Sequence, residues 1–174
     1  MRFFSSIRLV TLGLWLGAAV FFIFVAQSAF TVLPTRELAG VIVNRTLAIV
    51  NFGGMGIGLL LILTSLLGTP SLHRFWLWIE RFLLLILTAG CAVGQFVISQ
   101  WLSIVRSEMG KPIDEVALED PLRIQFNTLH EYSVWVLMAA MIAALLAFFI
   151  ISNRKYTVVV KDKPADPLLN DFKI

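Results

Sequence analysis

Long apolar stretches separated by short polar connections dominate the pattern along this chain. They cover residues 9–30, 41–67, 75–105 and 124–151. Each is long enough to cross a bilayer as a helix, which takes about 20 residues. The pattern therefore predicts an all-α fold, an integral membrane four-helix bundle. Residues 1–152 would form the four-helix domain, and residues 153–174 would form a tail.

Small residues four positions apart occur near the middle of every apolar stretch. The pairs are Gly13 with Gly17, Gly54 with Gly58, Gly90 with Gly94, and Ala140 with Ala144. Residues at i and i+4 share one face of a helix, and small ones let two helix backbones approach closely inside a membrane. The pairs predict tight packing seams between the helices and argue against a wide channel.

Composition agrees with a membrane protein. The chain is 59% hydrophobic and 14% charged, against roughly 45 to 50% apolar and 25% charged residues in soluble domains. Its net charge of +3 comes from dispersed basic residues that are not interleaved with aromatic ones, so no nucleic-acid partner is expected. A cleavable signal peptide over the first stretch is the less favoured alternative, because that apolar run is longer than a signal core.

The distribution of basic residues predicts how the helices are oriented. Lys and Arg are retained on the cytoplasmic side of a membrane. With the N-terminus inside, nine basic residues fall on the cytoplasmic side and five on the other. The nine are Arg2, Arg8, Arg74, Arg81, Arg154, Lys155, Lys161, Lys163 and Lys173, and the five are Arg36, Arg45, Arg106, Lys111 and Arg123. We expect cytoplasmic N- and C-termini.

Polar residues inside the spans are the candidates for function, because each is costly in lipid and usually faces the bundle interior. At equal depth near the predicted external end lie Gln27, Asn44, Arg45, Gln100, Asn127, His130 and Glu131. Glu131 is the expected counter-ion of Arg45. This outer layer is interpreted either as a polar cap that sets helix register or as a pocket for a cation or polar head group.

A second, inner polar layer is expected at the cytoplasmic end. It comprises His73, Arg74, Glu80 and Arg81.

The chain contains soft and imidazole side chains that are typical ligands of metals and haem. The soft candidates are Met55, Cys91, His130, Met138 and Met141, which would suit Cu(I) but are more simply core residues. A haem held by both histidines is disfavoured, because His73 and His130 are predicted at opposite faces, about 30 Å apart. No cofactor is predicted. The glycines of residues 53–58 follow no strand, so they do not indicate nucleotide binding.

Two polar segments outside the spans could contact partners. Residues 106–123 carry five acidic and three basic side chains, with a short helix expected near 114–118. The simplest interpretation of this segment is a solvated loop, and the alternative is a docking surface for an external partner or a cation. In the tail, residues 156–160 (YTVVV) have strand character and could add to a partner's sheet edge.

Residues 126–133 (FNTLHEYS), preceded by residues 120–123 (DPLR), resemble the F-[DN]-x-L-H-x-x-S signature of the transmembrane protein 205-like family, known in bacteria as a domain of unknown function. Residues 15–17 (WLG) and 21–22 (FF) of the first stretch agree with it, and the resemblance covers about residues 8–152. It implies a four-helix membrane protein without established enzymatic activity.

The resemblance carries two further implications. An animal relative is associated with platinum-drug resistance, which suggests export or metal handling. The family is also distantly similar to copper-resistance membrane proteins and to a four-helix protoporphyrinogen oxidase, in which a His of the first helix belongs to the haem or metal site. This chain has no His in its first apolar stretch.

These observations lead to one favoured function and two alternatives. We expect a non-catalytic accessory or assembly subunit of a larger membrane complex in the bacterial inner membrane, in contact with lipid and with membrane-protein partners. The alternative is a transporter or binder of a soft metal ion or small amphiphile. A haem-linked redox protein is the least favoured.

Overall fold

The computed structural model describes residues 2–66 and 74–153, with side chains from residue 5 onward, and all secondary structure in these ranges is helical. The helices are α1 (Arg2–Val32), α2 (Arg36–Leu66), α3 (Arg74–Val93), the π-helical turn η1 (Gly94–Ile98), α4 (Ser99–Glu108), the short 3-10 turn η2 (Ile113–Glu115) and α5 (Pro121–Ser152). The predicted all-α fold is confirmed for this part of the chain. Residues 156–160, the predicted strand-like segment, lie outside it.

Within residues 2–66 and 74–153, four helical segments are long and apolar enough to cross a membrane. Three of them lie in α1, α2 and α5. The remaining span, Arg74–Glu108, runs through α3, η1 and α4 as one rod. At about 1.5 Å per residue, the 35 residues of that rod exceed a hydrocarbon core of about 30 Å. The chain is therefore a multi-pass membrane protein by length and composition.

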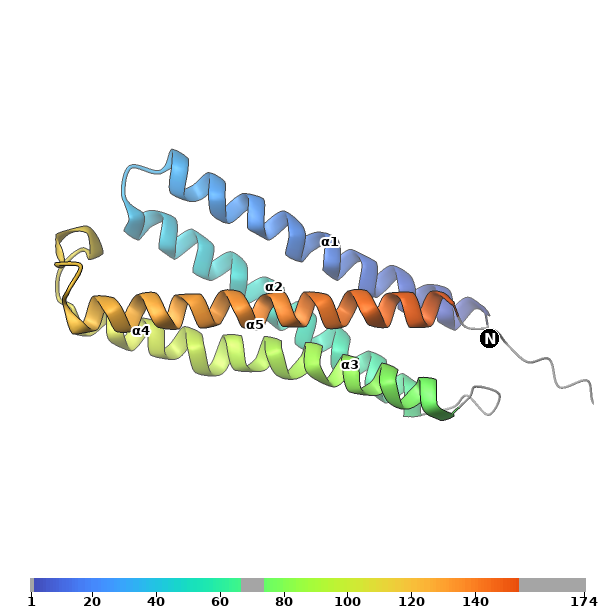
Figure 1. Cartoon of the computed structure of the whole chain (residues 1–174). Coiled ribbons are helices and arrows are strands. Elements are labelled where there is room, and N and C mark those ends of the chain that lie inside the picture. Colours follow the sequence, from blue (N-terminus) through green and yellow to red (C-terminus); the bar gives the residue numbers. More distant parts are fainter. Residues whose placement is uncertain (1, 67–73, 154–174) are drawn as a thin grey trace, which may run out of the picture.

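The helices form a ring in which each contacts two neighbours. α2 packs against α1 and α3, and α5 packs against α3 and α1. α2 and α5 have at most a few direct contacts, so they occupy opposite corners; in Figure 1, α5 runs in front and α2 behind. This diagonal placement determines where their outward faces point.

The two ends of the bundle differ in what they contain. We call the left end in Figure 1 the connection end, because residues 33–35 and 109–120 join the helices there. The opposite, terminus end holds the start of α1, the end of α2, the start of α3 and the end of α5. Which end faces the cytoplasm stays a prediction.

Close packing seams run through the bundle where three of the small-residue pairs were predicted to make them. A Cβ added at Gly54 would lie 2.5 Å from Cys91 Sγ, and one added at Gly58 would overlap Thr88 Oγ1. A Cβ at Gly90 would lie 3.3 Å from the Cβ of Ala140. Ala140 and Ala144 are themselves fully buried. Only glycine fits at Gly54 and Gly58 without displacing a neighbour.

The fourth pair behaves differently. A Cβ at Gly13 would be in ordinary contact with Phe148, whereas Gly17 is exposed with open space around it. The reason is helical phase. The buried stripe of α1 runs through Leu12, Trp15 and Ala19, and Gly17 lies two residues from Trp15, on the far side of the helix. Gly17 therefore does not form the predicted close helix contact within this chain.

Candidate functional site

A buried ion pair joins three helices at the terminus end. The Arg8 Nη2 on α1 lies 2.7 Å from Glu80 Oε1 on α3, and the same nitrogen donates a 2.9 Å hydrogen bond to the backbone oxygen of Leu61 on α2. The side chains are 9% and 1% exposed. Such a pair stabilises one arrangement of the helices, because separating its members leaves a charge buried without compensation.

Arg81 extends this polar cluster. Its Nε donates to Ser65 Oγ at 3.1 Å and its Nη2 to the Ser65 backbone oxygen at 2.7 Å. Of the predicted inner layer, Glu80 therefore pairs with Arg8, Arg81 contacts the end of α2, Arg74 is exposed, and His73 lies outside the described residues.

The partner of Glu80 was missed by sequence reasoning, which used Arg8 only to predict orientation. Arg8 precedes Leu12 and Trp15 by four and seven residues, which places it on the buried stripe of α1. That spacing was the signal that could have identified it.

All seven residues of the predicted outer layer are exposed. They are Gln27, Asn44, Arg45, Gln100, Asn127, His130 and Glu131. Asn44 Oδ1 accepts a 3.1 Å hydrogen bond from Ser99 Oγ, which links α2 to α4. The expected ion pair between Arg45 and Glu131 is not among those formed by the described part of the chain.

Helical phase explains why these two charges do not meet. Arg45 precedes the seam residue Gly54 by nine positions, and Glu131 precedes Ala140 by nine. Nine residues at about 100° each amount to two and a half turns. Each side chain therefore points directly away from the bundle, and their helices stand at opposite corners.

The connection between α4 and α5 folds over its end of the bundle. Arg36 Nε lies 3.3 Å from Asp114 Oδ1, and Arg106 pairs with Glu37. A second apolar cluster lies beneath it, built from Val105, Met109, Val116 and Leu129. The short helix predicted near 114–118 is a 3-10 turn at Ile113–Glu115. The acidic segment is therefore anchored to the start of α2.

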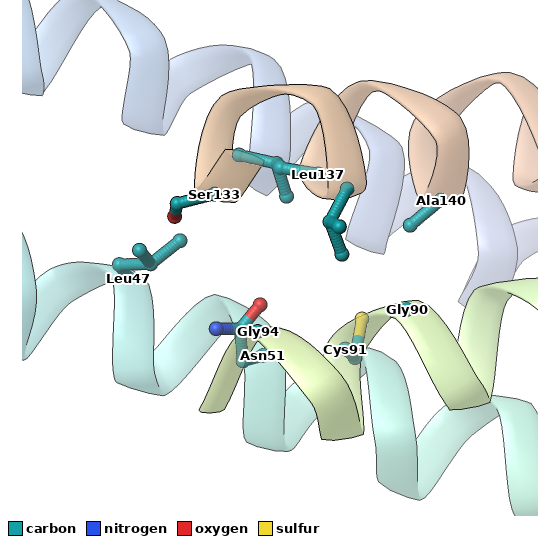
Figure 2. Close-up of a pocket in the computed structure, with 9 residues that line it drawn as sticks. Leu47, Asn51, Gly90, Cys91, Gly94, Ser133, Leu137 and Ala140 are labelled. Carbon is teal, nitrogen blue, oxygen red and sulfur yellow. The ribbon is translucent and has the colours of Figure 1, made fainter. Parts of the chain in front are cut away.

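A crevice lies halfway along the helices, between α2, α5 and the junction of α3 with η1 (Figure 2). Its empty volume is about 210 Å³, including space that opens to the surface, and it has no room for a water molecule. It is lined by Leu47, Asn51, Gly90, Cys91, Gly94, Ser133, Val136, Leu137 and Ala140.

Asn51 is the most unusual residue of this crevice. It is 4% exposed, and its amide makes no hydrogen bond within the part of the chain that the structure describes. Figure 2 shows the amide directed into the space between the helices, with Ser133 on the facing wall and Cys91 beside it. The π-helical turn begins at Gly94, where an added Cβ would lie 3.3 Å from Asn51 Nδ2. Single π turns in α-helices frequently accompany functional sites.

The crevice offers hydrogen-bonding groups and a thiol, with no charge. Within residues 2–66 and 74–153, no group of three or more His, Cys, Asp or Glu side chains could hold a metal ion. Of the soft candidates, Cys91 is buried, Met55 and Met141 are half-buried, and His130 and Met138 are exposed. Because His73 lies outside the described residues, the prediction that His73 and His130 lie too far apart to hold a haem together is not tested.

Residues 10–111, more than half of the chain, match the model of a family described as "Domain of unknown function (DUF4149)". The chain belongs to this family. The match runs from α1 to the end of α4 and does not reach residues 126–133, so it gives no support to the narrower resemblance that rests on them, or to a similarity with copper-resistance proteins. No curated protein and no solved structure matches the chain.

Proposed function

We propose that this family member is a non-catalytic accessory or assembly subunit of a larger membrane complex. The observation that carries the proposal is the placement of Arg45 and Glu131. Both are exposed, both point away from the bundle, and both lie well inside apolar helices. A bundle that functioned alone in lipid would gain nothing from charges in these positions.

Their depth follows from helix geometry. Arg45 is the tenth residue of α2 and Glu131 the eleventh of α5, which puts them about 14 and 15 Å from the helix starts. The two helices are about 46 to 48 Å long, so a centred hydrocarbon core of about 30 Å begins about 8 to 9 Å from each start. Both charges therefore lie about 5 to 6 Å inside the hydrocarbon layer.

Ionisable groups at such depth normally face a bundle interior, a water-filled cavity or a partner charge. Arg45 has a long side chain that can reach toward the interface. Glu131 has a shorter one and needs a partner closer to its own depth. Contact with another protein meets this need, because it replaces lipid with polar groups.

The complex would lie in the bacterial inner membrane with both termini of this chain in the cytoplasm. Nine basic residues on the predicted cytoplasmic side against five on the other support this orientation. The connection end, with its anchored acidic segment, would then face outward and offer an additional contact surface.

Mild-detergent extraction from the native membrane tests the proposal. We expect the chain to elute well above its own mass of 19.5 kDa plus detergent, because it is bound to partner chains in a fixed stoichiometry. The Glu131→Ala variant should lose these partners, while Glu115→Ala, which removes an exposed carboxylate outside the four membrane-spanning helices, should keep them. A monodisperse single chain from wild-type membranes would refute the proposal.

The crevice supports a second candidate function, the binding of a small amphiphile. The supporting observation is the side chain of Asn51, a residue that is 4% exposed, whose amide makes no hydrogen bond within the described residues and has Ser133 on the facing wall. A ligand with a small uncharged polar head would satisfy both groups once the walls moved apart. Mass spectrometry of lipids that co-purify with wild type and with Asn51→Leu tests it, and identical lipid profiles would eliminate it.

A further inference from the structure

We infer that the neighbour that pairs these charges is a second copy of the same chain, with Arg45 on α2 of one copy against Glu131 on α5 of the next. This inference rests on the proposed function and names the partner. It starts from charge complementarity. Inside the apolar layer, the described part of the chain carries one outward-facing cation and one outward-facing anion, on helices at opposite corners of the bundle.

The direction of the two helices permits the contact. Both α2 and α5 run from the connection end to the terminus end (Figure 1), so they are parallel in any two copies inserted with the same orientation. Arg45 is the tenth residue of its helix and Glu131 the eleventh of its own. Side-by-side copies therefore bring the two charges to the same depth within about one residue, or about 1.5 Å.

The residues that follow each charge continue the match. On α2, Arg45, Ile49, Phe52 and Gly56 are exposed, and on α5, Glu131, Trp135, Met138 and Ile142 are exposed. Both sets have the spacing i, i+4, i+7 and i+11, which forms one continuous stripe in parallel helices that wind around each other.

In that register the sizes of the facing side chains complement one another. Gly56, which has open space around it, would lie opposite the larger Ile142. A glycine in such a stripe lets two helices approach closely in lipid. The two stripes thus supply shape as well as charge for one contact.

The contact joins two different faces, so it is heterologous. A heterologous contact is not closed by a two-fold axis and repeats from copy to copy, giving a ring or a row in the membrane plane. This property separates it from a symmetric dimer in an experiment.

Disulfide cross-linking in native membranes tests the inference. In a Cys91→Ala background, Ile49→Cys and Trp135→Cys are introduced into one chain, and the membranes are oxidised. Disulfides require Cα atoms about 4.4 to 6.8 Å apart, so we expect about tenfold more product than from a control pair. The product should form a ladder at multiples of 19.5 kDa. Each single-cysteine variant should give none.

Leu14→Cys with Leu85→Cys is the matched control. Both residues are exposed, at nearly equal depth, on α1 and α3, the other two corners. Phe52→Cys with Met138→Cys is a second pair in the proposed register, in case the first pair prevents folding.

The outcomes separate this inference from the proposed function. A ladder from either proposed pair supports it. Cross-linking by a single cysteine indicates a symmetric dimer and overturns the heterologous contact. A product with a different protein overturns self-association and leaves the subunit role standing. If neither pair cross-links and mild extraction yields a single chain, both proposals fail.

Discussion

The two ends of this bundle use the same chemistry in opposite ways. At the terminus end, an arginine and a glutamate form a buried pair, Arg8 with Glu80. Toward the connection end, an arginine and a glutamate of similar depth, Arg45 and Glu131, remain exposed on opposite corners. The Arg8 and Glu80 charges are satisfied within the chain, whereas Arg45 and Glu131 are presented to its surroundings.

Helical phase accounts for the difference. Arg8 is four residues before Leu12, on the buried stripe of its helix, whereas Arg45 and Glu131 are each nine residues before a seam residue and so lie on the far side. The comparison teaches that the depth of a polar group in a membrane helix says little about its role until its direction is known.

The largest expected effect comes from breaking the buried pair. Glu80→Ala leaves the Arg8 charge buried without its carboxylate, and we expect a loss of about 3 to 5 kcal/mol in the free energy of unfolding. Denaturation in mixed micelles, followed by tryptophan fluorescence, measures it. The double variant Arg8→Leu with Glu80→Leu should recover much of the loss, because no isolated charge remains.

The exposed Glu115 provides the control for this experiment. Glu115→Ala should change the free energy of unfolding by less than about 0.5 kcal/mol. Equal losses from Glu80→Ala and Glu115→Ala would break the comparison between the two ends.

The next largest loss of stability is expected at the packing seam of α2. Gly58→Ala introduces a methyl group that overlaps Thr88 Oγ1, and we expect a loss of about 1 to 3 kcal/mol from overpacking. Gly17→Ala, at an exposed position with open space, should cost nothing measurable. If Gly58→Ala and Gly17→Ala had the same effect on stability, the helices would not be closely packed at Gly58.

A smaller effect is expected where α5 begins. Asp120 Oδ1 accepts a 2.8 Å hydrogen bond from the Leu122 N–H and caps the helix. Asp120→Ala should lower the free energy of unfolding by about 1 kcal/mol, and Asp120→Ser should restore most of it. Indistinguishable stabilities for the two variants would show that the cap contributes little.

The smallest effect is expected for the exposed ion pair at the connection end. Arg36 and Asp114 are 63% and 55% exposed, so Arg36→Gln should cost about 0 to 1 kcal/mol. The difference from wild type should shrink further in about 1 M salt, where screening is strong. A loss as large as that of Glu80→Ala would mean that the connection end depends on its ion pairs as the terminus end does.

The four spans could be predicted from the sequence because apolar runs of this length have one common explanation. The helix starts could not be located as well. Apolar character begins at residue 9, yet α1 starts at Arg2, since polar residues continue a helix beyond the hydrocarbon layer. α2 begins at Arg36, five residues before its apolar run. The preceding residue, Thr35, caps this start, because its Oγ1 accepts a hydrogen bond from the Leu38 N–H.

The candidate site was less predictable, for a reason that applies to its individual residues. Grouping Arg45 with Glu131 by depth ignored their direction, and the two face away from each other's helices. The spacing of Gly54 and Gly58 correctly predicted a packing seam on that face of α2. The crevice beside it depends on the π-helical turn at Gly94–Ile98, and an apolar pattern does not distinguish that turn from a continuous α-helix.

Native mass spectrometry of the extracted protein tests most directly the claim that the outward charges complete an assembly. Wild type should appear as a complex of several 19.5 kDa chains. Arg45→Glu and Glu131→Arg should each reduce it to single chains, and the double variant should restore the complex by exchanging the two charges. A wild-type protein that is a single chain without partners, or variants that assemble as wild type does, would contradict the account.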